Sequence, residues 1–317
     1  MGDAAAVLLT GGLVAFPTET VYGLGADASN AAAVARIYSV KGRPADHPLI
    51  VHVATMDGLG DWAREVPEYA ISLARDFWPG PMTLVLRRSE LAGDYVTGGQ
   101  DTVGVRVPAD PVALGLLEAF ARAGGKGVAA PSANRFGNVS PTSAQAVAAE
   151  LGDYLADGDQ IIDGGACAVG VESTIIDCTA DAPKILRPGA ITAEMIEAST
   201  GLKVVDVDSA ADSDAIRVSG SLDSHYAPAA TVVLDQSPTA GQGFIAMADV
   251  VAADGVVRLA APTTHEEFAR VLYAALRAAD EQGLATVVVH QPVGDGIAIA
   301  ICDRLKRAAH SDEKINE

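Results

Sequence analysis

The sequence is poor in cysteine, in aromatic residues and in positive charge. It has 3 cysteines among 317 residues, and aromatic side chains make up 5% of the chain. Cys167, Cys178 and Cys302 form no CxxC pair and have no histidines at zinc-ligand spacing. This pattern excludes a disulfide framework and favours a reducing compartment. We expect all three to be small hydrophobic residues, buried or partly buried.

Long hydrophobic runs are also missing. The longest, Ala4–Leu9 and Ile297–Cys302, fall far short of the roughly 20 residues that a membrane-spanning helix needs. Asp3 stands where a signal peptide would carry lysine or arginine. Hydrophobic residues make up 49% and charged residues 20% of the chain, which indicates a globular protein with a substantial core. We therefore expect no membrane association and a cytoplasmic location.

Positive charge is scarce, because 22 lysines and arginines face 41 acidic residues and the net charge is −19. Proteins that bind nucleic acids usually present a basic stripe to the phosphates. No run rich in lysine or arginine occurs here, so we expect no stable direct binding to nucleic acid. The few cations that stand in Gly/Pro-rich turns are expected to receive a small anion in a pocket.

Familiar phosphate-binding and nucleophile motifs are absent as well. The chain has no GxxxxGK[ST] loop and no GxGxxG fingerprint. Ser173 lacks a nucleophile elbow, and the six histidines form no metal-spaced or triad-like set. Glu19 and Glu172 are the only glutamates inside the motifs described below. We expect Glu172 to position a helix or loop rather than to act as a general base.

Apolar β-branched runs alternate with amphipathic stretches over the first two thirds of the chain, which predicts an α/β domain. The spacing leaves the order and direction of the strands open. Strands are expected at Leu13–Phe16, Leu49–Val53, Thr83–Arg87, Thr102–Val107, Val128–Ala130, Ile161–Ile162 and Ser173–Asp177. Helices are expected over Ala31–Tyr38 capped by Asn30, from Pro111 to about Ala123, and up to Leu151 from a capping box of Thr142 and Gln145.

A change of character at Val205–Ser224 predicts an interdomain linker. Four aspartates with no base among them precede a Ser-Gly-Ser triplet, so the stretch buries little. An ordinary surface loop is the alternative, although the length favours a connection between domains. We divide the chain into a catalytic domain over residues 1–201, a linker or lid over 202–230 and a smaller domain over 231–317.

The smaller domain repeats the α/β pattern. A helix over Glu266–Glu281 is expected to begin at a capping box of Thr264 and Glu267, and a last helix over Ile297–Ala309 to end in Arg304, Lys306 and Arg307, which suit the negative end of its dipole. The domain carries no cluster of catalytic type, so we interpret it as a supporting or closing domain. Strands are expected at Thr231–Leu234, Phe244–Met247, Val256–Leu259 and Thr286–His290.

Isolated cations in turns are the strongest chemical signal. Lys41-Gly42-Arg43-Pro44 places two cations just before a buried strand, an arrangement that suits a triphosphate. A solvated surface turn is the alternative. Arg106 lies in a strand that ends at proline, and it is either an exposed edge residue or a buried receptor for a carboxylate. Arg187 is a similar single cation before a Pro-Gly turn.

Small and hydroxyl residues supply a second signal. Pro131-Ser132-Ala133-Asn134 follows a short apolar strand, and a turn of such residues lets backbone N–H groups and the Ser132 hydroxyl approach phosphate or carboxylate oxygens closely. Ser140 lies just before the next helix, whose N-terminus offers a further anion site.

Taken together, these segments resemble the YrdC-type threonylcarbamoyl-AMP synthases across roughly residues 8–200. His225-Tyr226-Ala227-Pro228 is similar to the two-domain members, which add a C-terminal domain. The resemblance implies a YrdC-like twisted mixed sheet with flanking helices, plus a second, smaller Rossmann-like α/β domain. The matching stretches are PTETVYGLG at 17–25, KGRPADHPLIVHV at 41–53, PSAN at 131–134, VESTIID at 171–177 and LRPGAIT at 186–192.

The resemblance also implies a reaction, a nucleotidyl transfer in which L-threonine, bicarbonate and ATP give threonylcarbamoyl-AMP and pyrophosphate. Mg2+ would be carried largely by phosphate and water, and the product would pass to a tRNA threonylcarbamoyltransferase complex. Lys41 and Arg43 would be catalytic, and Arg106 would take the threonine carboxylate. The implied threonine pocket is Thr20, His52, Arg106, Ala130 and Ser173. The implied ATP site is Lys41, Arg43, His47, Thr102, Ser132, Ser140, Arg187 and Tyr226, with no dedicated metal ligands.

One departure concerns the linker. Many two-domain members carry a basic, aromatic stretch before His-Tyr-Ala-Pro, whereas Val218–Ser224 contains no cation. Arg217, His225 and Tyr226 would be left to clamp the phosphates. Two other functions stay open: a double-stranded-RNA-binding protein without adenylate-forming activity, which the charge opposes, and a carbamoyl-phosphate-dependent adenylate-forming enzyme, whose additional domains are missing here.

Overall fold

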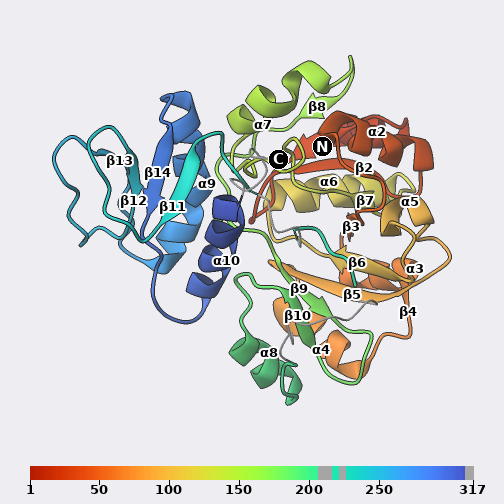
Figure 1. Ribbon diagram of the computed structural model, residues 1–317. Coiled ribbons are helices and arrows are strands. Elements are labelled where there is room, and N and C mark those ends of the chain that lie inside the picture. Colours follow the sequence, from red (N-terminus) through yellow and green to blue (C-terminus); the bar gives the residue numbers. More distant parts are fainter. Residues whose placement is uncertain (206–215, 221–225, 311–317) are drawn as a thin grey trace.

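The computed structural model describes residues 1–205, 216–220 and 226–310, which form two α/β domains side by side (Figure 1). The larger domain holds a ten-stranded mixed sheet in the order β10-β9-β5-β6-β3-β7-β2-β1-β8, with β4 paired to β5. Its strands are β1 (Val14–Phe16), β2 (Gly23–Asp27), β3 (Ile50–His52), β4 (Ala63–Arg64), β5 (Met82–Arg88), β6 (Thr102–Arg106), β7 (Val128–Ala129), β8 (Gln160–Ile161), β9 (Thr174–Asp177) and β10 (Lys184–Arg187).

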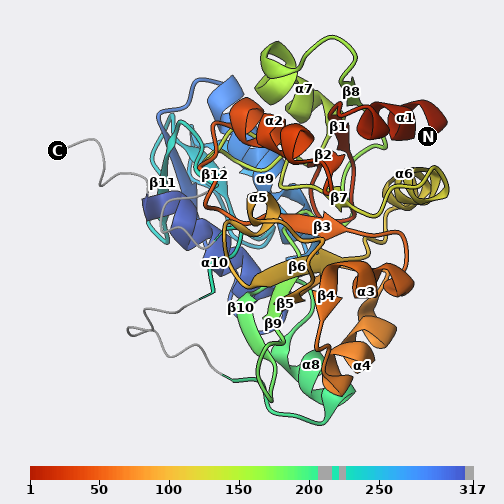
Figure 2. The same cartoon turned by 90° about the vertical axis from the view of Figure 1, so that its right-hand side faces the viewer.

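Helices flank the larger sheet on both faces, as Figure 2 shows from the side. Helices α1 and α6 pack against each other and bury apolar residues of β1 and β7, including Phe16 and Val128. Helix α4 packs against α8. The helices are α1 (Gly2–Leu9), α2 (Ala31–Lys41), α3 (Leu59–Trp62), α4 (Glu68–Phe77), α5 (Asp94–Thr97), α6 (Pro111–Arg122), α7 (Ala144–Leu151) and α8 (Ala193–Thr200).

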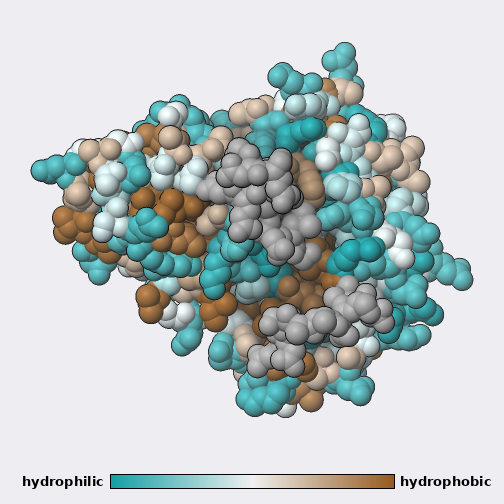
Figure 3. Space-filling view, viewed as in Figure 1, coloured by the Kyte–Doolittle hydropathy of each residue, from teal (hydrophilic) through white to brown (hydrophobic). Residues whose placement is uncertain are grey.

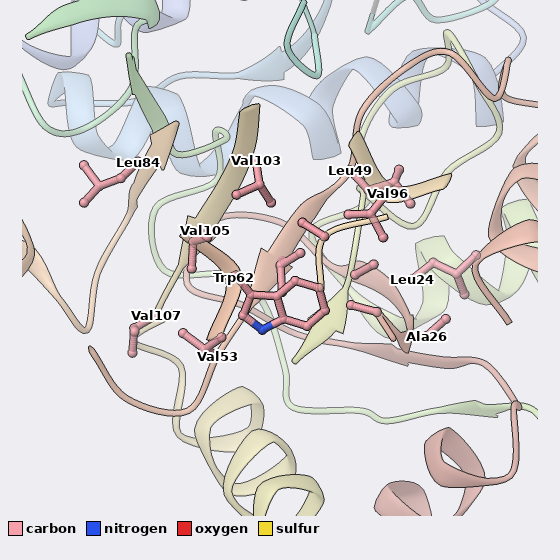
Figure 4. Close-up of a cluster of buried hydrophobic side chains, with 14 of the residues drawn as sticks. Leu24, Ala26, Leu49, Val53, Trp62, Leu84, Val96, Val103, Val105 and Val107 are labelled. Atoms are coloured by element: carbon pink, nitrogen blue, oxygen red, sulfur yellow. The ribbon is translucent and has the colours of Figure 1, made fainter. Parts of the chain in front are cut away.

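The main core fills the opposite face of this sheet (Figure 4). Trp62 lies at its centre, fully buried, among the apolar side chains of β3 and β6 and their neighbours. Its indole N–H donates to the Lys126 carbonyl at 3.2 Å, so the largest core side chain leaves no polar atom unpaired. This core fixes the strands whose ends carry His52 and Arg106.

The smaller domain is a parallel sheet in the order β11-β14-β12-β13, flanked by two helices. Both helices lie between this sheet and the larger domain (Figure 1). The mixed sheet and the second α/β domain confirm the predicted fold class. The elements are β11 (Thr231–Leu234), β12 (Gly243–Ile245), β13 (Val257–Ala260), α9 (His265–Glu281), β14 (Thr286–Val289) and α10 (Ile297–Ala309).

Two helix boundaries differ from the sequence prediction. Helix α2 continues past Tyr38 to Lys41 and ends at Gly42, whose left-handed φ of 63° suits glycine. Helix α7 is capped by Ser143, whose hydroxyl accepts from the Ala146 N–H at 3.2 Å, so the predicted cap at Thr142 was wrong by one residue. Ser143 and Thr142 are adjacent hydroxyl residues, and side-chain chemistry alone does not distinguish them.

Strand β2 begins inside the glycine-rich PTETVYGLG stretch and continues to Asp27, where no strand was predicted. A Cβ on Gly25 would lie 2.8 Å from both the Phe16 ring and a Val128 methyl, so the glycine permits close packing between β1, β2 and β7. Residues 17–22 are thereby held as a connection between two antiparallel strands, with Phe16 opposite Gly23.

Residues 216–220, one of the described parts of the linker, pack against the larger sheet. Val218 is buried in a cluster with Val85 and Ile175. The Arg217 N–H donates to Gln100 Oε1 at 2.7 Å, and its guanidinium donates to the Gly98 carbonyl at 2.7 Å. The expectation that this stretch buries little is therefore wrong at Val218. The aspartate-rich stretch and His225 lie outside the described residues.

Cys167 and Cys178 are buried and Cys302 is partly buried, all as free thiols, as predicted. No helix within the described ranges is long and apolar enough to cross a membrane. On the face shown in Figure 3, hydrophilic side chains predominate and apolar ones gather over the smaller domain.

Candidate functional site

A cavity lies between the larger sheet and two parts of the linker, residues 219–220 and Tyr226. All five residues of the predicted threonine pocket line it, together with four of the predicted ATP residues, Arg43, Ser132, Arg187 and Tyr226. Lys41, His47, Thr102 and Ser140 do not line this cavity. The other lining residues are Thr18, Val21, Gly23, Ile50, Pro131, Glu172, Ser219 and Gly220.

Backbone pairing between distant motifs shapes one wall. The Leu24 N–H donates to the Pro131 carbonyl and the Ala133 N–H donates to the Tyr22 carbonyl, each at 2.8 Å. Lys41 reinforces this loop, because its ammonium group donates to the carbonyls of Ser132 at 2.6 Å and Asn134 at 2.5 Å. The PSAN stretch is thus fixed as a turn with Ser132 facing the cavity.

Lys41 does not lie in an exposed turn, as the sequence suggested, but in the last position of α2, where it is 1% exposed. Burial, and secondarily the neighbouring Arg43, lowers the pKa of its ammonium group well below the usual value. Its observed contacts are to the loop that carries Ser132. The sequence analysis missed this position because it ended the helix at Tyr38, three residues too early.

Arg106 is buried, which rules out the exposed edge position. Its guanidinium forms an ion pair with Glu19 at 2.6 Å and donates to Thr20 Oγ1 at 3.0 Å and to the Gly80 carbonyl at 3.3 Å. An arginine side chain has five N–H donors, and these three contacts leave others for a ligand. Glu19 also accepts from the Ala109 N–H at 3.0 Å, which holds the pair rigidly.

His52 faces the same end of the cavity. Burial and then the nearby Arg106 lower the pKa of its imidazole to about 3, so the ring is neutral near pH 7. Its Nδ1 atom is buried and has no hydrogen-bond partner among the described residues. Buried polar atoms without a protein partner are rare, and such an atom is available to bond to a water molecule or a ligand. A neutral imidazole there can bond to a hydroxyl or amine.

Arg43 and Arg187 converge on the linker residue Ser219. Arg43 donates to the Ser219 hydroxyl at 3.1 Å, and Arg187 donates to the Ser219 carbonyl at 2.9 Å. Arg187 also donates to the Ser173 carbonyl through two nitrogens. Burial lowers the pKa of Arg43 to about 10, which leaves it charged near pH 7, and its Nε has no partner among the described residues. Two cations aimed at one point suit a polyanion.

Glu172 connects the cavity to the smaller domain. Its carboxylate accepts from the Ser140 hydroxyl at 2.7 Å, from the Tyr273 hydroxyl at 2.9 Å and from Arg304 Nε at 2.7 Å. Burial alone would raise the pKa of this carboxyl, but Arg304, and then Arg187, outweigh burial and lower it to about 2. An ionised carboxylate with three donors is a positioning group rather than a base.

This depressed pKa predicts an acid-sensitive contribution to stability. The folded pKa of Glu172 is about 2, below the ordinary value of 4.5, so the contribution is present above pH 4.5 and is lost as the pH falls toward 2. It should be on the order of 3 kcal/mol. Urea unfolding of wild type and Glu172→Gln at several pH values measures it: the stability difference should shrink below pH 4.5. A constant difference down to pH 3 would contradict this assignment.

His47 and Thr102 lie beside the main cavity rather than in it. The His47 ring packs edge-on against Phe136 at 5.3 Å, and the Arg43 guanidinium lies 5.7 Å from the same ring centre. Thr102 lines a neighbouring cavity of about 300 Å3, which shares Ile50 and Ser219 with the main one and is mostly apolar. The two cavities therefore lie next to each other, on either side of Ile50 and Ser219.

Gly220 and Tyr226 bring the linker over the cavity. Gly220 has a left-handed φ of 83°, and a Cβ there would collide with the Tyr226 hydroxyl. Tyr226 is 1% exposed, with its ring stacked 5.8 Å from that of Tyr273. The sequence indicated Tyr226 through the HYAP motif, whereas Ser219 and Gly220 carried no signal except their small size.

Gly220→Ala should therefore displace Tyr226 or the linker and weaken ATP binding roughly tenfold, about 1.4 kcal/mol. Gly241→Ala is a matched control, because Gly241 has a similar φ of 84° and open space around its Cα. ATP titration of both variants measures the effect. Equal losses in the two variants would mean that backbone strain alone, and not the contact with Tyr226, is responsible.

The cavity offers hydroxyl groups and cations but few free carboxylates. Within the part of the chain that the structure describes, no group of three His, Cys, Asp or Glu residues could hold a metal ion. Glu172 is the carboxylate of the cavity wall, and it already accepts hydrogen bonds from three donors.

Comparison with known proteins agrees with this arrangement. The Sua5/YciO/YrdC family model, described as telomere recombination, matches residues 6–189. A model described as threonylcarbamoyl-AMP synthase, C-terminal domain, matches residues 191–310.

Two curated relatives match nearly the whole chain. The threonylcarbamoyl-AMP synthase of Pyrococcus abyssi is 42% identical, over 96% of this chain and 93% of that protein. The threonylcarbamoyl-AMP synthase of Bacillus subtilis is 40% identical, over 98% and 92%. The solved structure of P. abyssi Sua5 complexed with L-threonine superposes with a TM-score of 0.86 at 40% identity, covering 97% of this chain and 93% of that one. The chain therefore belongs to the Sua5/YciO/YrdC family, in the two-domain form that carries the threonylcarbamoyl-AMP synthase C-terminal domain.

Proposed function

We propose that the protein is an L-threonylcarbamoyladenylate synthase, a nucleotidyltransferase that makes threonylcarbamoyl-AMP and pyrophosphate from L-threonine, bicarbonate and ATP for tRNA modification. The single observation that carries the proposal is one cavity in which a buried arginine with spare donors, Arg106, lies at one end and two convergent arginines, Arg43 and Arg187, at the other. The full-length relatives that bear the synthase name support it.

Each end suits one substrate. At the first, Arg106 receives the threonine carboxylate, and the unpaired Nδ1 of His52 bonds to the threonine hydroxyl or amine. At the second, Arg43, Arg187 and the Ser132 turn bind the phosphates, and Mg2+ enters with ATP as part of the substrate. The neighbouring apolar cavity that contains Thr102 takes the nucleoside.

The chemistry then needs positioning more than an enzyme nucleophile. The threonine amine bonds to the carbon of bicarbonate or of CO2, and with bicarbonate a water molecule leaves. An oxygen of the resulting carbamate attacks the α-phosphorus, the bond from that phosphorus to the bridging oxygen breaks, and pyrophosphate departs. Arg43 and Arg187 stabilise the charge that develops on the phosphates.

Lys41 and Ser140 do not line the main cavity, and in this proposal both act indirectly. Lys41 acts by holding the loop that carries Ser132, and Ser140 acts through Glu172. The product passes to a tRNA threonylcarbamoyltransferase complex, and the protein works in the cytoplasm. Ser219 bonds to both phosphate-binding arginines, so in this proposal the phosphates of ATP displace it, and the linker then closes over the phosphates.

Isotope incorporation tests the function. Purified protein is incubated with 13C-bicarbonate, L-threonine and Mg-ATP, and the products are identified by mass spectrometry. The proposal predicts a labelled threonylcarbamoyl adenylate with an equal amount of pyrophosphate, both dependent on threonine. Pyrophosphate release without threonine, or no labelled adenylate, would overturn it.

Arg106→Ala should weaken threonine binding by about 2–5 kcal/mol, the scale for removing one partner of a buried charge pair, and should leave ATP binding nearly unchanged. Because the substitution also leaves Glu19 unpaired, the double variant Glu19→Gln/Arg106→Ala is the control. Calorimetric titration with each substrate measures both effects. If threonine binding recovers in the double variant, Arg106 serves only to neutralise Glu19.

A further inference from the structure

Arg304, on α10 of the smaller domain, is a fully buried cation placed against the active-site wall. Its guanidinium side chain is completely covered, yet it belongs to neither set of predicted site residues. The sequence analysis assigned it to the helix dipole at the end of α10. The structure instead directs it away from that end and into the domain interface.

Three motifs of the site meet at this one guanidinium. Nε donates to Glu172 at 2.7 Å, and Nη2 donates to the carbonyl of Pro188 at 2.9 Å, the residue that follows Arg187. The guanidinium carbon also lies 5.4 Å from the centre of the Tyr226 ring, within cation–π distance. Arg304 thus contacts the proposed ATP ligand Tyr226 directly. It reaches Ser140 through Glu172, and it contacts Pro188, the neighbour of Arg187.

Charge balance explains why the contact matters. Glu172 lines the cavity, and its buried carboxylate needs a cation. The nearest alternative is Arg187, whose observed donors go to Ser173 and Ser219 and not to Glu172. Without Arg304, Glu172 would draw Arg187 toward itself and away from the phosphates.

We propose that Arg304 is a positioning residue for the ATP site: it neutralises Glu172 and supports Tyr226, and so keeps Arg187 available to the nucleotide. This inference rests on the proposed function. The smaller domain then contributes to adenylation through the contact between Arg304 and Glu172, in addition to covering the cavity. The threonine residues Thr20, His52 and Arg106 have no contact with Arg304, and only Ser173 is linked to it, indirectly, through Arg187. Threonine binding should therefore depend on Arg304 much less than ATP binding does.

The test compares Arg304→Met with Arg304→Met/Glu172→Gln, and with Arg277→Met as a matched control. Arg277 is also an interdomain arginine, paired with Glu150 at 3.0 Å and bonded to the Val139 carbonyl, but none of these residues lines the cavity. The readouts are calorimetric ATP affinity and the KM values for ATP and threonine from pyrophosphate release. Melting temperatures show which variants fold.

Arg304→Met should weaken ATP binding about tenfold or more with little change for threonine, and the added Glu172→Gln should recover most of the loss, as expected for residues coupled in one network. Arg277→Met should change the binding of ATP and of threonine equally, or change neither.

The proposal is overturned if the two arginine variants behave alike, or if the double variant folds but binds ATP as weakly as Arg304→Met. If Arg304→Met does not fold, near-normal ATP affinity of the double variant supports the proposal and a tenfold loss contradicts it. Calorimetry needs no turnover. A wild-type protein that binds ATP but makes no adenylate would therefore contradict the proposed function and leave the role of Arg304 in ATP binding testable.

Discussion

Replacing Arg187 or Arg43 by alanine is expected to lower the rate of threonine-dependent pyrophosphate release roughly 100- to 1,000-fold, the scale for losing one donor to a charge that develops in the transition state. Both guanidinium groups donate to Ser219, and both line the main cavity. Replacement by lysine should restore only part of the rate, because the ammonium group lacks the planar, forked donor geometry.

Arg88→Ala provides the matched control for this prediction. Arg88 lies at the end of β5 in the same sheet, but it pairs with Asp94 at 2.6 Å and does not line the main cavity. Steady-state kinetics of the three alanine variants measure the effect. Near-normal turnover in either Arg43→Ala or Arg187→Ala would show that the phosphates bind elsewhere.

Ending the chain after Gly201 should abolish nearly all synthase activity and should also destabilise the larger domain. The smaller domain covers Val21, Val139 and Val171 in a shared apolar cluster, so truncation exposes these residues to water. It also removes Arg304 and Tyr273 from Glu172. A buried carboxylate that loses its ionic partner costs about 3–5 kcal/mol.

The truncated variant with Glu172→Gln separates the two effects. It should regain part of the lost melting temperature, because no unpaired charge remains, but it should stay inactive because Tyr226 and the linker are missing. Thermal unfolding and pyrophosphate release measure these outcomes. Full activity in either truncated form would show that the linker and the smaller domain take no part in catalysis.

Local patterns allowed most of the fold to be predicted. β-branched runs gave seven strands of the larger sheet, and the helix of the smaller domain begins at Thr264, whose hydroxyl accepts from the Glu267 N–H at 3.1 Å. Strand β2 escaped because glycine disfavours strands, and only the packing of Phe16 against Gly25 explains it. The order of the strands depends on contacts between distant segments, which no local pattern encodes.

Part of the candidate site could likewise be predicted from local motifs, whereas its contacts between distant segments could not. Motif resemblance located the residues of the main cavity, because each motif carries a distinctive residue in a turn or at a strand end. Glu19 and Ser219 were missed as partners of Arg106, Arg43 and Arg187, since these contacts join segments more than 30 residues apart. Arg304 had one usable signal: it lies on the apolar stripe of its helix, between Ile301 and Leu305, where a cation requires a buried partner.

Structure determination with L-threonine and a non-hydrolysable ATP analogue tests the central claim most directly. The account predicts that threonine lies against Thr20, His52 and Arg106, that the phosphates replace Ser219 between Arg43 and Arg187, and that the nucleoside enters the cavity containing Thr102. A nucleotide bound elsewhere, with Ser219 still held by both arginines, would contradict it.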